Sequence, residues 1–156
     1  MGTRIKKIIS GGQTGADRAA LDVAIKLGIL HGGWCPRGHL AEDGVINERY
    51  ELTEAPNEEP GQRTEWNVRD SDGTVIFSIA NKLTGGSART REFAEKHGKP
   101  CLHLSRERDG AKALQMLAEF IEANRIAILN VAGPRASEEP DEAEFVRSTL
   151  LASLSS

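Results

Sequence analysis

Short apolar runs alternate with helix-like patterns along the chain, and this alternation restricts the possible folds more than any other feature of the sequence. Runs with strand character lie at residues 5–9, 29–31, 74–79, 100–104 and 126–131. Helical patterns lie at residues 18–27, 63–70, a segment ending near 97, 111–123 and 139–154. Because parallel strands need crossover connections, the pattern predicts an α/β fold with a mainly parallel sheet covered on both faces.

Composition narrows the class of protein. The chain has 156 residues, of which 28% are charged and 38% hydrophobic, as is ordinary for a globular domain. We therefore expect a single domain over residues 1–156. A net charge of −3 argues against nucleic acid and membrane surfaces as partners. The chain has no signal-peptide pattern and no apolar run of membrane-spanning length, so we expect a cytoplasmic protein. Its cysteines and histidines lack the spacing of zinc ligands, so no metal site is predicted.

The first glycine-rich segment lies between a predicted strand and a predicted helix. Backbone N–H groups in such a turn lie beside the positive end of the helix dipole and bind anions, usually phosphate. Asp17 begins the helix and is equally well explained as an N-cap. The whole segment can also be a tight turn without a ligand, and it lacks the dinucleotide and P-loop patterns. The candidate ligand-binding residues of this segment are Gly11, Gly12, Gln13, Thr14, Gly15 and Asp17.

Two more glycine-rich segments follow later strands. Right-handed crossovers bring the carboxyl ends of parallel strands to one edge of the sheet, where open α/β sheets bind their ligands. We therefore expect all three segments to meet at one site. Thr90 has a second interpretation, because its hydroxyl can bond to the backbone in the first helical turn. The candidates in these two segments are Gly85, Gly86, Ser87, Thr90, Gly133 and Arg135.

Charged residues in loops complete the candidate site. Arg37 and Arg135 can each clamp a phosphate through a planar guanidinium, or be solvated loop charges. Glu42 and Asp43 can bind a base or ribose, act as an acid–base group, or remain solvated. Residues 70–73 are similar to the start of a calcium loop, but the later ligands are missing, so a structural turn is favoured.

Taken in order, these motifs resemble a family of bacterial molybdenum-carrier proteins that is related to the algal molybdenum-cofactor carrier protein. The family is described as a circularly permuted branch of the superfamily that contains the LOG, or lysine-decarboxylase-like, nucleotide-processing proteins. Each motif is weak alone, but their order is specific and they cover nearly the whole chain. The matching segments are residues 11–18, 33–38, 41–44, 67–74, 85–90 and 129–135.

The resemblance implies a Rossmann-like three-layer sandwich, a homo-oligomer and a phosphate-bearing small ligand. It makes a binding or carrier protein the leading hypothesis, with molybdenum cofactor (molybdopterin) or a nucleotide as the ligand. No catalytic residue is assigned under this hypothesis.

The alternative hypothesis is a nucleotide-processing hydrolase, a phosphoribohydrolase-like N-glycosidase. Its acid–base candidates are Glu92, Glu42 and Asp43, with Arg89 or Arg91 on the phosphate. The LOG enzymes use a P-G-G-x-G-T-x-x-E loop. Residues 84–92 keep two glycines and Glu92 but lack the proline and the third glycine, which argues against glycosidase chemistry.

Overall fold

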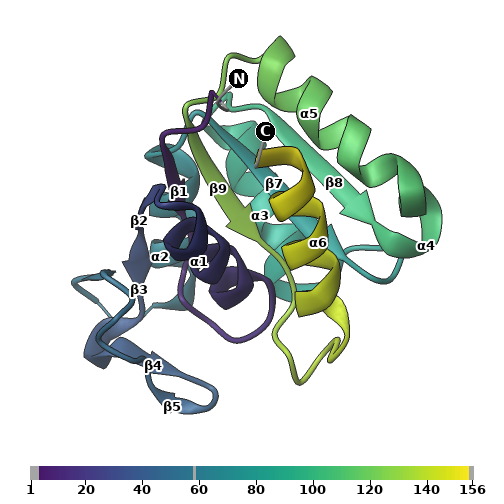
Figure 1. Cartoon of the computed structure of the whole chain (residues 1–156). Helices are drawn as coiled ribbons and strands as arrows, with labels where there is room; N and C mark the ends of the chain where they lie inside the picture. The colour runs from purple at the N-terminus through teal and green to yellow at the C-terminus, as the bar shows by residue number, and fades with distance from the viewer. Residues whose placement is uncertain (1–3, 58, 155–156) are drawn as a thin grey trace.

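Five parallel strands form the central sheet, in the order β2-β1-β9-β7-β8 (Figure 1). The computed structural model describes residues 4–57 and 59–154, so the ends of the expected domain 1–156 and residue 58 lie outside the described residues. All four strand pairings of this sheet are parallel, which confirms the predicted sheet type. The strands are β1 (Lys7–Ile9), β2 (Leu30–Gly32), β7 (Gly73–Ser78), β8 (Cys101–Ser105) and β9 (Ile128–Ala132).

Helices cover both faces of the sheet and make the three layers of a Rossmann-like sandwich (Figure 1). One face carries α1 (Ala16–Leu27), α5 (Ala113–Ala123) and α6 (Glu142–Leu154), and α6 packs against both of the others. The other face carries α2 (Pro60–Arg69) and α3 (Gly85–Lys96), which pack against each other. A short helix, α4 (Arg106–Asp109), and a 3-10 turn, η2 (Gly110–Lys112), lead from β8 into α5.

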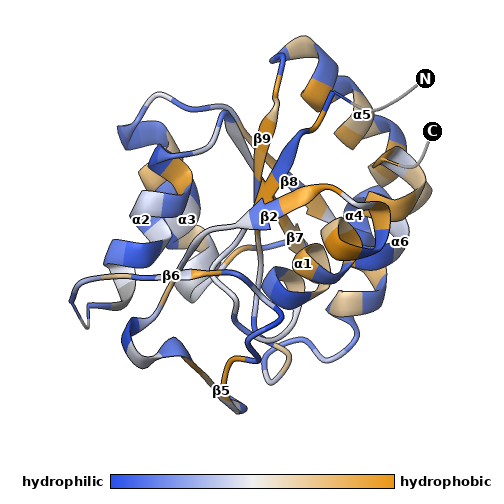
Figure 2. Cartoon of the chain, turned by 60° about the vertical axis from the view of Figure 1, so that its left-hand side comes forward, coloured by the Kyte–Doolittle hydropathy of each residue, from blue (hydrophilic) through white to orange (hydrophobic). Residues whose placement is uncertain are grey.

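The main hydrophobic core lies between the sheet and the α1–α5–α6 layer. Every residue of β7 is buried, as expected for a strand inside a parallel sheet. Figure 2 shows β9 as apolar over most of its length, whereas α2 and α3 are largely hydrophilic. The α2–α3 layer is therefore the layer in which polar side chains are available to a ligand site.

A long connection links β2 to α2. It contains β3 (Trp34–Cys35), the 3-10 turn η1 (Arg37–His39), the antiparallel pair β4 (Leu40–Ala41) and β5 (Gly44–Val45), and β6 (Thr53–Glu54), which pairs in parallel with β3. A second apolar cluster of Leu21, Cys35, Ile46 and Tyr50 fastens this connection to α1. Cys35 is fully buried there.

Several element boundaries differ from the sequence-based prediction. The helix predicted at 111–123 begins only at Ala113, because η2 occupies the preceding residues. The helix predicted from 139 begins at Glu142. Gly85 and Gly86 lie in the first turn of α3 rather than in a loop before it. The turn at 70–73 is structural as predicted, because Asp72 Oδ2 accepts hydrogen bonds from the backbone N–H groups of residues 127 and 128.

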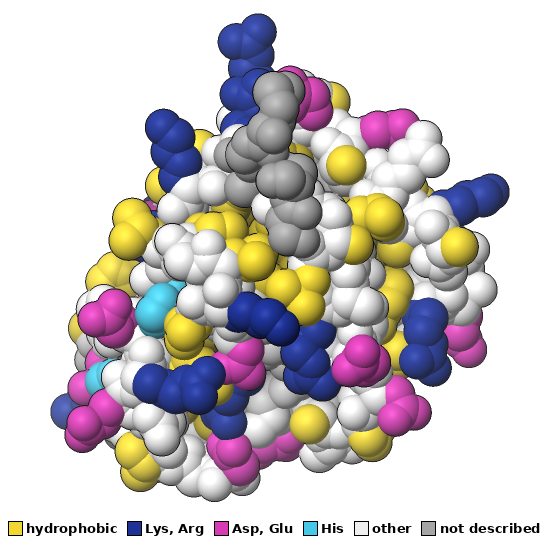
Figure 3. All heavy atoms as spheres, in the orientation of Figure 1, with side chains coloured by type: hydrophobic (Ala, Val, Ile, Leu, Met, Phe, Trp, Pro, Cys, Tyr) yellow, Lys and Arg dark blue, Asp and Glu magenta, His cyan; other side chains and the backbone are white. Residues whose placement is uncertain are grey.

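The surface is mixed in charge. On the face shown in Figure 3, positive and negative side chains alternate over the lower half. Among residues 4–57 and 59–154, no helix has both the length and the apolar character to cross a membrane. β1 begins and α6 ends on the same side of the sheet, opposite the edge where the strands end (Figures 1 and 2).

Candidate functional site

A cavity of about 410 Å³ lies beyond the carboxyl ends of β1 and β9. β1 connects to β2 on one side of the sheet and β7 to β8 on the other, with β9 between them, so the cavity is at the switch in strand order where such folds bind ligands. All three glycine-rich segments contribute to its wall. The predicted site residues that line it are Gly11, Gln13, Asp17, Arg37, Gly86, Ser87, Thr90, Gly133 and Arg135.

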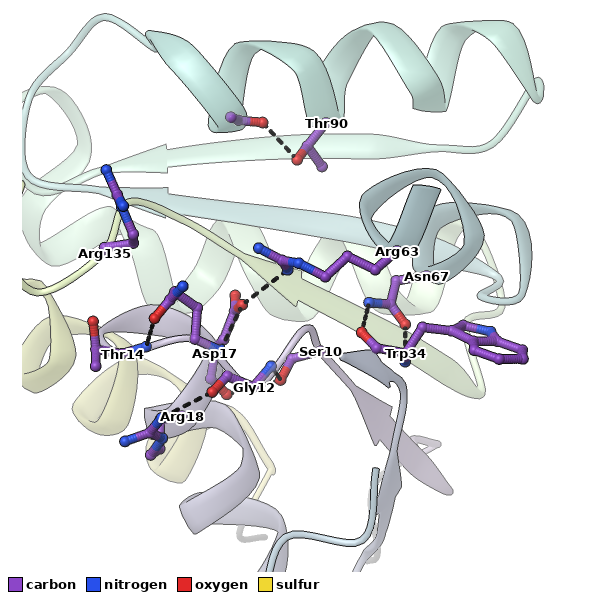
Figure 4. A network of polar contacts seen from close by, with 12 residues as sticks. Ser10, Gly12, Thr14, Asp17, Arg18, Trp34, Arg63, Asn67, Thr90 and Arg135 are labelled. Carbon is purple, nitrogen blue, oxygen red and sulfur yellow. Dashed lines mark hydrogen bonds and ion pairs between the residues drawn. The ribbon is translucent and has the colours of Figure 1, made fainter. Parts of the chain in front are cut away.

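Asp17 and Arg63 face each other inside the cavity (Figure 4). Arg63 Nη1 lies 4.0 Å from Asp17 Oδ2, which is too far for a hydrogen bond. Asp17 is 7% exposed. Burial raises the pKa of its carboxyl to about 6, although Arg63 lowers it in part. Asp17 lies within α1 and does not cap it; Gly15 holds the N-cap position.

Three backbone donors of the first glycine-rich segment, those of Gly12, Gln13 and Thr14, already have acceptors. Gln13 N–H donates to Asp17 Oδ2 at 3.2 Å. Gly12 N–H donates to Ser10 Oγ at 3.4 Å, and Thr14 N–H donates to the side-chain oxygen of Gln13 at 3.1 Å. This segment therefore presents a carboxylate to the cavity rather than a set of free amides.

The N-terminus of α3 offers the free donors. Thr84 occupies the N-cap position but its side chain makes no capping hydrogen bond. Within the described part of the chain, the N–H groups of Gly86 and Ser87 and the Ser87 hydroxyl have no acceptor. Ser87 is nonetheless only 6% exposed. Because the first amides of a helix carry partial positive charge, this end of the cavity is suited to an anion.

Three arginines and three acids line the cavity together. Arg37 has no ion pair among the described residues. Arg135 lies 3.3 Å from Glu138 and is half-exposed, so its charge is partly balanced. The Thr90 hydroxyl donates a hydrogen bond to Gly86 O at 2.9 Å. This is the backbone bond within the first helical turn that the sequence offered as a second interpretation of Thr90.

The predicted site residues Gly12, Gly15 and Gly85 do not line the cavity. Gly15 has a φ of +84°, and an added Cβ would lie 2.6 Å from the carbonyl oxygen of Pro134, so it allows the first and third segments to touch. Gly12 packs against Leu52. Gly85 has a φ of +54° at the start of α3, in open space.

Thr14, Glu42 and Asp43 are occupied by contacts within the protein. Glu42 accepts hydrogen bonds from Ser137 and Thr14, and these bonds lower the pKa of its carboxyl. Asp43 pairs with Arg18 at 2.6 Å, and this hydrogen bond lowers the pKa of Asp43. Neither carboxylate lines the cavity. Both instead hold the connection between β2 and α2 against neighbouring segments, through the hydrogen bonds to Thr14 and Ser137 and the ion pair with Arg18.

Sequence reasoning missed two important parts of the wall. Arg63 and Asn67 are four residues apart and therefore lie on one face of α2, and both line the cavity. Asn67 also fastens β3, since it accepts from Trp34 N–H at 2.8 Å and donates to Trp34 O at 3.0 Å (Figure 4). Their spacing of four residues in the helix predicted at 63–70 was the sequence signal that could have placed both side chains on one helical face.

Glu92 lies elsewhere. It lines a second hollow together with Lys82, Arg91, His103 and Arg108. His103 is buried, its Nε2 lies 2.6 Å from Ser78 Oγ, and burial lowers its pKa to about 4. The acid–base candidate of the hydrolase hypothesis is thus outside the cavity formed by the glycine-rich segments.

A buried carboxyl lies behind the third segment. Glu142 is fully buried, and neither carboxyl oxygen has a hydrogen-bond partner among the described residues. Burial, followed by the neighbouring Glu139, raises the pKa of Glu142 to about 10. A Cβ added to Gly133 would lie 2.9 Å from Glu142 Oε1. Over residues 4–57 and 59–154, no three His, Cys, Asp or Glu side chains gather to hold a metal ion.

Comparison with known proteins agrees with this architecture. A family model of the circularly permutated YpsA SLOG family matches residues 8–154. A crystal structure from Syntrophus aciditrophicus SB, named "putative molybdenum carrier protein", is 48% identical in sequence. The match covers 99% of this chain and 98% of that chain, with a TM-score of 0.95. A comparison with curated proteins found no match.

Proposed function

Because the chain belongs to the circularly permutated YpsA SLOG family, we propose that it is a carrier that binds a small phosphate-bearing ligand in the cavity between α2, α3 and the third glycine-rich segment. The observation that carries the proposal is the end of the cavity at α3. There, α3 amides and the Ser87 hydroxyl without an acceptor among the described residues lie in the same cavity as Arg37, which has no ion pair with any of those residues. Backbone amides at a helix N-terminus combined with an arginine are suited to a phosphate group.

Molybdenum cofactor and nucleotides are the proposed ligands. A volume of about 410 Å³ lies within the range of small-molecule sites. The name of the Syntrophus protein favours a molybdenum-related ligand. The hydrolase alternative is less favoured, because Glu92 faces the other hollow and Glu42 and Asp43 are bonded within the protein.

Calorimetric titration tests this proposal. Purified protein would be titrated with molybdenum cofactor, GMP and AMP, and we expect submillimolar binding of at least one. Nucleotide recovered from the complex should be intact, with no free base by chromatography. Absence of binding by every probe would refute the carrier function, and release of base would restore the hydrolase.

Replacing Arg37 by alanine should weaken binding of the ligand found above by about 10-fold or more, because a hydrogen bond to a charged group contributes roughly 1.5–3 kcal/mol. The matched control is Arg147→Ala, which removes the same charge from α6, where Arg147 pairs with Glu144. The control should bind like the wild type. Equal losses in both variants would show that net charge, rather than Arg37 itself, sets the affinity.

A further inference from the structure

The cavity has two chemically different ends. At α3 it presents donors, namely free amides and the Ser87 hydroxyl. At α1 it presents the Asp17 carboxylate, which is an acceptor when ionised. A phosphate would be repelled by Asp17, so it belongs at the α3 end. Whatever part of the ligand reaches Asp17 must instead donate hydrogen bonds.

Asp17 has unused capacity for such bonds. An ionised carboxylate has about four acceptor positions, of which Gln13 N–H takes one at 3.2 Å and Gly11 N–H takes another, so about two remain for a ligand. Arg63 lies 4.0 Å away, beyond hydrogen-bond distance. A nearly buried carboxylate gains most from donors that replace lost water. The site therefore favours a ligand that brings adjacent N–H groups to Asp17.

Arg63 adds the complementary requirement. Its guanidinium lines the cavity beside Asp17 and its side chain is 19% exposed. A guanidinium only donates, so the ligand group next to the N–H donors should be an acceptor such as a carbonyl oxygen. Neighbouring N–H, amino and carbonyl groups occur together on the 2-aminopyrimidin-4-one edge of guanine and of pterins.

We propose that Asp17 and Arg63 together recognise the 2-aminopyrimidin-4-one edge of a guanine or pterin ring, while the phosphate of the same ligand lies at the N-terminus of α3. Asp17 accepts from the ring N–H and the amino group, and Arg63 donates to the carbonyl oxygen. This inference rests on the proposed function and narrows its ligand to one class of heterocycle.

The test is a set of ligands with the same phosphate and different ring edges. GMP, IMP, AMP and 6-hydroxymethylpterin phosphate would be titrated calorimetrically at pH 7.5, above the pKa of about 6 for Asp17. IMP lacks the amino group, and AMP lacks both the ring N–H and the carbonyl. We expect GMP or the pterin phosphate to bind at least about 10-fold more tightly than AMP, with IMP between GMP and AMP. The relative affinities of GMP and the pterin phosphate show whether the site prefers a guanine or a pterin ring.

Asp17→Asn should abolish this preference. Inorganic phosphate should still compete with the phosphorylated ligands for the variant as it does for the wild type, because the α3 end is unchanged. The matched control is Glu144→Gln, which neutralises an exposed acid of α6 that does not line the cavity and should keep the preference. Equal affinity of wild-type protein for GMP, the pterin phosphate and AMP would overturn the ring assignment while leaving phosphate binding intact. Failure of every phosphorylated probe to bind would instead overturn the proposed function.

Discussion

Replacing Gly33 by alanine is expected to cost about 3–5 kcal/mol of unfolding free energy, which is a large part of a typical domain's stability. Gly33 has a φ of +126°, and an added Cβ would lie 2.2 Å from Ser10 O and 2.8 Å from Ser10 N. Both atoms are backbone at the end of β1, so neither can rotate away. Denaturant unfolding at 25 °C measures the loss.

Gly44→Ala is the matched control for this substitution. Gly44 also has a positive φ, +111°, but nothing lies within 4 Å of an added Cβ. Its cost should be limited to backbone strain, about 1–3 kcal/mol. If both variants lost the same stability, the close contact with Ser10 would not be the cause.

The second large effect is expected at Glu142. Its pKa is raised from 4.5 to about 10 in the folded protein, so the folded state keeps a proton that the unfolded state releases above pH 4.5. The contribution of Glu142 to the free energy of unfolding is therefore fully present below pH 4.5. It falls by about 1.4 kcal/mol per pH unit as the pH rises towards 10. Glutamine has the same shape and does not titrate. Glu142→Gln should match the wild type near pH 4.5 and be more stable by about 3–4 kcal/mol at pH 7.5.

Thermal and denaturant unfolding across pH 4.5–9 would measure this difference. Glu144→Gln is the control, because that side chain lies on the same helix and is 76% exposed. The difference in free energy of unfolding between Glu144→Gln and wild type should not increase with pH. If the free energies of unfolding of Glu142→Gln and wild type differed by the same amount at every pH, Glu142 would ionise in the folded protein as it does in the unfolded chain. The raised pKa would then not be the cause of the difference.

The fold was largely predictable because strand and helix periods differ clearly in this chain. The alternation predicts a parallel sheet, and the carboxyl ends of parallel strands must share an edge, so the meeting of residues near 11, 86 and 133 followed from topology. The order β2-β1-β9-β7-β8 did not follow, since strand order depends on which helical faces pack. The family resemblance stated from the motifs is confirmed by the family match over residues 8–154.

The candidate site was predictable only in outline. Its glycine-rich segments were identifiable because each follows a predicted strand, and because glycines with a positive φ, such as Gly12, Gly15 and Gly85, mark the turns beside the cavity. The roles of acidic residues depend on partners far away in the sequence. Glu42 is bonded to Ser137, and Asp17 is matched by Arg63 from α2. No local sequence pattern distinguishes a carboxylate that bonds within the protein from one that faces a cavity. The roles of these acidic residues could therefore be assigned only from the structure.

The positions of the first strand and the last helix have a practical meaning. β1 begins and α6 ends together on the side away from the cavity (Figures 1 and 2). Ends placed side by side satisfy the geometric condition for re-routing a chain, because a linker can join them while a new opening is made at a surface turn. A fusion partner joined before β1 or after α6 would likewise start on the side of the sheet away from the cavity.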